Sequence, residues 1–125
     1  MGCEGDIRWY TYVMNKTLTS LVVDLTASST RLMEAKKALT IANLNLAKVE
    51  RVLAEKRNSA IVEGKAVGSN EAQRNASLAV LLAEETKAVD IASDDVVMAK
   101  LNVELASIEN STVKYSITAL TATEE

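Results

Sequence analysis

Five basic side chains lie in the middle of the sequence, and they are the residues best suited to hold an anion. They are Arg51, Lys56, Arg57, Lys65 and Arg74. Guanidinium and ammonium groups bind phosphate through charge-assisted hydrogen bonds, and the free amides of a helix N-terminus add to such a site. One interpretation is a contact with a small anion, nucleotide or nucleic acid. The other is a solvated helix tip.

Groups able to perform catalysis or bind a metal are scarce. The chain has no His and one Cys, Cys3, so it lacks the residues for Ser–His or Cys–His chemistry and for an imidazole–thiolate metal site. The acidic pairs 84–85 and 94–95 are helix neighbours, whose carboxylates do not face each other. We therefore expect no enzyme, no metal and no cofactor.

The composition favours a helical protein of the cytoplasm. The chain has 125 residues, of which 48% are hydrophobic and 25% charged, with four Gly and no Pro. So few turn residues disfavour a sheet of many strands. The net charge of -3 disfavours strong binding to duplex DNA. A single Cys and the lack of a signal peptide or apolar span predict a reduced cytoplasmic location and no membrane contact.

Two apolar registers with alternating spacings of three and four residues run through the two halves of the chain. The first extends from Leu18 to Leu53 and the second from Leu78 to Leu120. This spacing is typical of helices that pack along one seam. It predicts an all-α single domain over 1–125, a long antiparallel two-helix coiled-coil hairpin that assembles into a helical bundle. Helix 1 is expected over about 11–63, the turn over 64–69 and helix 2 over about 70–121.

The residues around the turn support these boundaries. Gly64 suits the left-handed position that follows a helix, and Asn70 suits an N-cap with Gln73 as its capping-box partner. The run 26–30 is rich in Ser and Thr, which allows a kink in helix 1. At the open end of the hairpin, we expect the aromatic residues of segment 9–12 to pack rather than to stack on bases.

Register arithmetic tests the hairpin. In an antiparallel seam, the numbers of paired residues have a constant sum, and the two registers agree on a sum of 131, centred within the turn. The predicted pairs include Leu25 with Ala106, Ser28 with Val103, and Leu46 with Glu85.

A second apolar stripe lies on the other side of helix 2. It consists of Ile91, Met98, Leu101, Leu105, Ile108 and Tyr115. An exposed stripe of this size marks an interface. It predicts either self-association into a bundle or a groove that accepts a foreign helix or host protein.

The segment 64–78 resembles a recurring pattern in small phage and prophage proteins. There, a Gly-Lys stretch, then Ser-Asn-Glu, then an Arg four residues after the Asn opens the second helix of a helical hairpin; here these are Gly64-Lys65, Ser69-Asn70-Glu71 and Arg74. This largely uncharacterised family often lies near phage recombination genes. The resemblance implies a phage context, no known catalysis, and action on host or phage DNA-processing or defence machinery.

Together these features predict a non-catalytic, phage-type accessory or interaction protein of the host cytoplasm. It would act on a protein partner through an oligomeric coiled-coil surface formed by the second stripe. Two alternatives remain open. One is a nucleic-acid-associated recombination accessory factor that uses the basic tip, and the other is an oligomer that sequesters a small anion or nucleotide against host defence.

Overall fold

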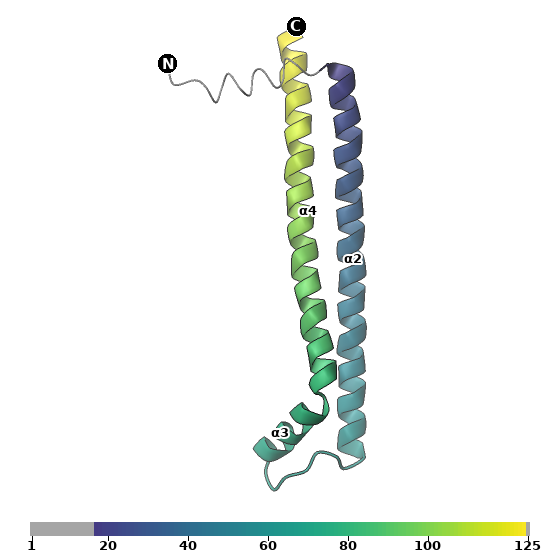
Figure 1. Ribbon diagram of the computed structural model, residues 1–125, viewed down its shortest axis with the longest axis vertical. Coiled ribbons are helices and arrows are strands. Elements are labelled where there is room, and N and C mark those ends of the chain that lie inside the picture. The colour runs from purple at the N-terminus through teal and green to yellow at the C-terminus, as the bar shows by residue number, and fades with distance from the viewer. Residues whose placement is uncertain (1–16, 125) are drawn as a thin grey trace, which may run out of the picture. The chain divides into compact units, whose positions relative to one another are not determined.

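The computed structural model describes residues 17–124, which form three helices and no strand. The helices are α2 (Leu18–Val62), α3 (Glu71–Leu81) and α4 (Ala83–Glu124) (Figure 1). The predicted all-α class is confirmed for these residues. The chain divides into two compact units, of which unit 1 comprises Met1–Lys37 with Leu101–Glu125 and unit 2 comprises Ala38–Lys100.

Burial follows the predicted seam. Leu21 is fully buried, and the register positions from Leu25 to Leu53 on α2 are buried or half-buried, whereas Leu18 at the end of the register is 43% exposed. The buried apolar residues of the described chain are Leu21, Ala60, Leu78, Leu82, Ala92, Val96, Ala99, Val113 and Leu120. Every member of this set except Ala60 falls on one of the two registers, and Ala60 lies one heptad beyond Leu53, so the heptad pattern identified the buried faces.

In unit 1, the beginning of α2 lies beside the end of α4 and runs in the opposite direction (Figure 1). Leu21 and Leu120 form a buried cluster, and Ile117 and Ala119 pack against it. Farther along α2, the Ser28 Oγ donates a hydrogen bond to the Asn110 Oδ1 at 2.8 Å. The residue numbers of the contacting positions rise along α2 while they fall along α4, so this part of the chain is an antiparallel helix pair.

The register of this pair differs by one heptad from the predicted one. The pairing of Ser28 with Asn110 gives a sum of 138, whereas the predicted sum of 131 placed Ser28 opposite Val103. The predicted register would also set the Asn110 amide against Leu21, and an unsatisfied buried polar group costs about 1–3 kcal/mol. A shift of seven residues keeps the same apolar faces in contact and brings the two polar seam residues together.

The kink that the Ser- and Thr-rich run 26–30 allows does not occur, and α2 is one uninterrupted helix from Leu18 to Val62. Here the hydroxyls bond to the helix itself. Thr26 Oγ1 donates to the Val22 carbonyl at 3.1 Å, and Thr30 Oγ1 donates to the Thr26 carbonyl at 2.9 Å. Such bonds satisfy the side chains without interrupting the backbone ladder.

The helix start also differs from the prediction. Thr17 caps α2, because its Oγ1 accepts the Ser20 N–H at 3.0 Å, so Thr17 is not helical and α2 begins at Leu18. The rest of the predicted start, 11–16, lies outside the described residues. The aromatic residues Trp9, Tyr10 and Tyr12 lie outside them as well.

We predict that Asn110→Ala destabilises the protein by about 1–3 kcal/mol, because it removes the acceptor for both Ser28 and Ser29 in a buried seam. Urea unfolding measures this change. Asn102→Ala, an exposed Asn on the same helix, is the matched control and should change stability by less than about 0.5 kcal/mol. Equal effects of the two substitutions would show that the seam hydrogen bonds do not stabilise this register.

In unit 2, α2 ends at Val62, just before the predicted stop residue Gly64. This glycine has a φ of +73°, its N–H donates to the Ile61 carbonyl at 3.1 Å, and the Lys65 N–H donates to the Ala60 carbonyl at 2.8 Å. The two bonds form a Schellman motif, which satisfies the last carbonyls of the helix. The predicted helix stop is therefore confirmed.

The predicted N-cap of α3 is confirmed, with one change in the capping box. The Asn70 Oδ1 accepts the Gln73 N–H at 2.8 Å. However, the Gln73 Oε1 accepts the N–H of Ser69 rather than that of Asn70, also at 2.8 Å. The Ser77 Oγ then donates to the Lys65 carbonyl at 3.3 Å, so α3 is bonded to the loop that precedes it.

The predicted continuous helix 70–121 is interrupted. It consists of α3 and α4, separated at Leu82, whose φ and ψ are -104° and 19°. Figure 1 shows that the chain changes direction between the two helices. No Pro or Gly lies near Leu82, so the local sequence contains no signal for this bend. At the other end, α4 extends to Glu124.

The loop glycines give a second prediction. Gly68 has a φ of +145°, and an added Cβ would lie 2.5 Å from the Gln73 Cβ, whereas a Cβ on Gly64 would meet open space. Gly64→Ala should cost about 1–2 kcal/mol for its left-handed backbone, and Gly68→Ala should cost more because it adds a steric clash. Urea unfolding of both variants tests this order, and a smaller loss for Gly68→Ala would contradict it.

Candidate protein-interaction surface

The outer face of α4 is apolar and uncovered. The predicted stripe residues are exposed by 53% (Ile91), 56% (Met98), 44% (Leu101), 57% (Leu105), 64% (Ile108) and 69% (Tyr115). They lie on one uninterrupted helix, on the side away from the buried seam. Contiguous apolar surface of this kind is typical of interfaces. Among the residues that the structure describes, the hairpin buries one face of α4 and leaves the other exposed.

Small residues lie between the large ones in the unit 1 part of this face. Ser107, Ser111 and Thr112 line a hollow of about 340 Å³ together with Ile108 and Tyr115. A large side chain of an approaching helix can enter such a hollow, as in knobs-into-holes packing. This face of α4 therefore has a hollow between its large side chains, of the kind that helix packing uses.

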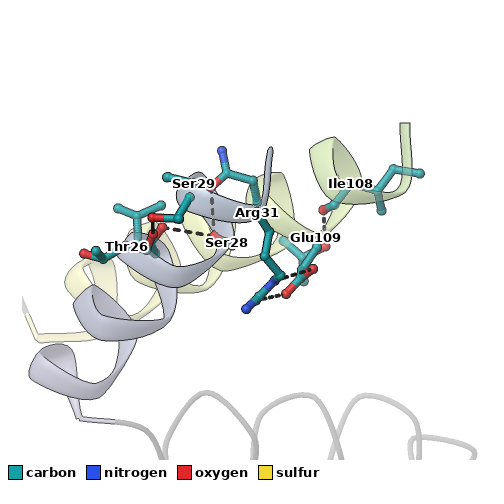
Figure 2. A network of polar contacts seen from close by, with 10 residues as sticks. Thr26, Ser28, Ser29, Arg31, Ile108 and Glu109 are labelled. Carbon is teal, nitrogen blue, oxygen red and sulfur yellow. Dashed lines mark hydrogen bonds and ion pairs between the residues drawn. The ribbon is translucent and has the colours of Figure 1, made fainter. Parts of the chain in front are cut away.

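A polar network joins the two helices beside this face. Arg31 of α2 forms a two-pronged ion pair with Glu109 of α4, with Nε donating to Oε2 at 3.3 Å and Nη2 to Oε1 (Figure 2). The hydrogen bond to Glu109 raises the pKa of Arg31. Because both side chains are about half exposed, the pair adds little to stability. Its main effect is to neutralise one of the acidic groups next to the apolar stripe.

The basic cluster of unit 2 is largely occupied by contacts within the chain. Lys56 Nζ lies 2.6 Å from Glu85 Oε1, and Lys65 Nζ lies 2.9 Å from Glu63 Oε2. Arg74 Nη1 donates to the Gly68 carbonyl at 3.5 Å. Among the described residues, only Arg51 and Arg57 of this cluster have no such contact. The tip therefore offers an anion less free positive charge than the sequence indicates.

The contact between Lys56 and Glu85 also changes their titration. The hydrogen bond to Glu85 raises the pKa of Lys56. In return, the hydrogen bond from Lys56, followed by the backbone N–H of Glu85 itself, lowers the pKa of Glu85. A lowered carboxyl pKa means that the pair stabilises the fold above the ordinary Glu range, and that this contribution is lost as the pH falls through the lowered pKa.

We predict that Lys56→Gln raises the pKa of Glu85 toward its ordinary value, because the main cause of its lowering is removed. A carboxyl-carbon NMR titration of Glu85 measures this change. Lys65→Gln is the matched control, since Lys65 pairs with Glu63 instead, and it should leave the Glu85 titration in place. An unchanged Glu85 midpoint in Lys56→Gln would show that the ion pair is absent in solution.

A second hollow, in unit 2, could not be expected from the sequence. It has a volume of about 360 Å³, and its apolar lining includes Leu53, Leu78 and Leu82. The same hollow is bordered by Arg57 and Asn75. Glu50 lines the hollow as well, so its border carries one basic and one acidic side chain. The hollow borders the bend at Leu82, for which no residue type gives a signal.

Other kinds of site find no support in the described part of the chain. Residues 17–124 contain no group of three or more acidic or Cys side chains placed to hold a metal ion. The acidic neighbours Asp94 and Asp95 are both exposed. None of the described helices combines the length and apolarity needed to cross a membrane.

Comparisons with protein-family models, with curated proteins and with solved structures found no match to this chain. The phage resemblance of segment 64–78 therefore stays a prediction. The outer face of α4 carries six of the exposed large apolar residues of the described chain.

Proposed function

We propose that this chain is a non-catalytic helical-hairpin interaction protein. It self-associates through the outer face of α4 into a helical bundle, and the assembly binds a protein partner. In line with the resemblance of the turn segment, we assign it a phage-type accessory role in the host cytoplasm, directed at host or phage machinery.

The observation that carries this proposal is the exposure of six large apolar side chains on one face of α4, between 44% and 69% each. Their area left in water is unfavourable at about 25 cal/mol per Å². A helix that is apolar on two faces is normally covered on both, as in a bundle. Contact with other helices supplies the missing cover.

The small core of the hairpin points in the same direction. Among the described residues, nine apolar side chains are buried and nineteen large ones are exposed. Two packed helices cannot enclose a core in the way that three or four can. Assembly would therefore add stability to the chain as well as form a binding surface.

The test is the mass of the native protein and its dependence on the α4 face. Sedimentation equilibrium of the wild type should show a multimer, and Leu105→Glu should dissociate it to the monomer, because the substitution would bury a charge in the interface. Val80→Glu is the matched control: Val80 is 80% exposed on α3, outside the face, and its substitution should leave the multimer intact. A monomeric wild type at high protein concentration would refute self-association.

The partner is tested with the same three proteins. Each is tagged, expressed in a bacterial host, and recovered with whatever it binds, and the recovered proteins are compared by mass spectrometry. A partner recruited by the assembly should appear with the wild type and Val80→Glu but not with Leu105→Glu. Equal recovery of the same proteins with all three would contradict a role of the α4 face in binding.

A further inference from the structure

The stripe on α4 has a symmetrical spacing. From Ile91 to Tyr115 the intervals are 7, 3, 4, 3 and 7 residues, which read the same in both directions and are centred on Val103. A surface that pairs with itself about a twofold axis must be self-complementary. We infer that the α4 face packs against the same face of a second copy, antiparallel, with the twofold axis at the level of Val103. This rests on the self-association proposed above.

In this arrangement every large apolar residue of the stripe faces another. Paired numbers sum to 206, so Leu101 faces Leu105 of the second copy, Met98 faces Ile108, and Ile91 faces Tyr115. Each pair occurs twice because of the symmetry. Since α4 is uninterrupted from Ala83 to Glu124, helical geometry keeps these residues on one face.

The polar positions of the same face also match. Continuing the three–four spacing adds Asp94 and Thr112, which likewise sum to 206 and face each other across the axis. The Thr112 hydroxyl now donates to the Ile108 carbonyl at 2.9 Å, and rotation would allow it to donate to the Asp94 carboxylate instead. A shift of one heptad would place Asp94 opposite Ala119 and Thr112 opposite Leu101. In the seam as well, the register is the one that brings the polar residues together, as Ser28 with Asn110.

The exposed area is sufficient for a stable dimer. With about 200 Å² for each large side chain, exposures of 44% to 69% leave roughly 700 Å² on the six residues. Complete coverage of the stripe in two copies would bury at most roughly 1,400 Å² in total, which reaches the usual range of about 1,200–2,000 Å² for specific interfaces.

Like charges would meet beside the stripe at two positions, and one of these contacts is relieved by an ion pair within the chain. Asp95 would lie near Glu109 of the second copy, and Glu109 is neutralised by Arg31. At the axis, Glu104 would face Glu104 of the second copy, a like-charge pair without such relief. The second contact marks the position of the axis, since no other register brings these two carboxylates together.

Distances between spin labels test the arrangement in the full chain. Single labels are placed on Asn102→Cys and Thr118→Cys in a Cys3→Ser background, at two exposed sites. At 1.5 Å per residue, the labels should be separated along the axis by about 3 Å at 102 and about 45 Å at 118. Pulsed electron paramagnetic resonance measures both values, and circular dichroism verifies that each variant keeps its helices.

The outcomes are distinct. Short distances at both sites in a multimer would indicate parallel helices and overturn this inference while self-association stands. A separation at 118 near 35 Å would mean that the numbers of paired residues sum to 213 rather than 206. The axis would then lie half a heptad away, and the stated pairing would be overturned. A monomer by sedimentation would overturn self-association and this inference together.

Glu104→Gln provides an independent check. Removal of the like-charge contact at the axis should tighten the dimer about twofold at low salt, and salt should reduce the difference. Glu71→Gln on α3, far along the chain from the stripe, is the matched control and should leave the dissociation constant unchanged. Equal constants for the wild type and Glu104→Gln would show that the two Glu104 side chains do not meet.

Discussion

The hydrogen bond between Ser28 and Asn110 is the contact on which the pairing in unit 1 depends. Apolar heptads alone allow several registers that differ by seven residues, because each shift returns Leu and Ala to the same face. A buried amide and a buried hydroxyl have only one register in which they meet. Once these two are paired, Leu21 lies beside Leu120, and Arg31 reaches Glu109.

The seam also decides which surface is left for contact. It occupies the narrow face of α4 that carries Val96, Ala99 and Val113, all buried. The stripe from Ile91 to Tyr115 lies on the opposite side, and no other helix within residues 17–124 covers it. The proposed assembly and the proposed pairing of α4 with a second copy both follow from this exposed apolar face.

At the turn end, contacts within the chain change the meaning of the charges. In sequence, five cations form a cluster that suits an anion. In the structure, Lys56 lies against Glu85 and Lys65 against Glu63, so two of the positive charges are compensated locally. The bend at Leu82 adds a hollow that combines an apolar lining with Arg57. These features shift the weight of the functional argument from the tip to the outer face of α4.

The sequence by itself determined the helical class, the buried faces and the ends of the turn, because these depend on local rules of spacing and capping. Gly64 and Asn70 stand where a helix stop and an N-cap require them. Tertiary structure decided the register, the uninterrupted course of α2 through 26–30, the break at Leu82 and the ion pair of Lys56 with Glu85. Each of these depends on which residues of distant segments meet or on how the whole helix is held, and a seven-residue repeat is degenerate to shifts by its own period.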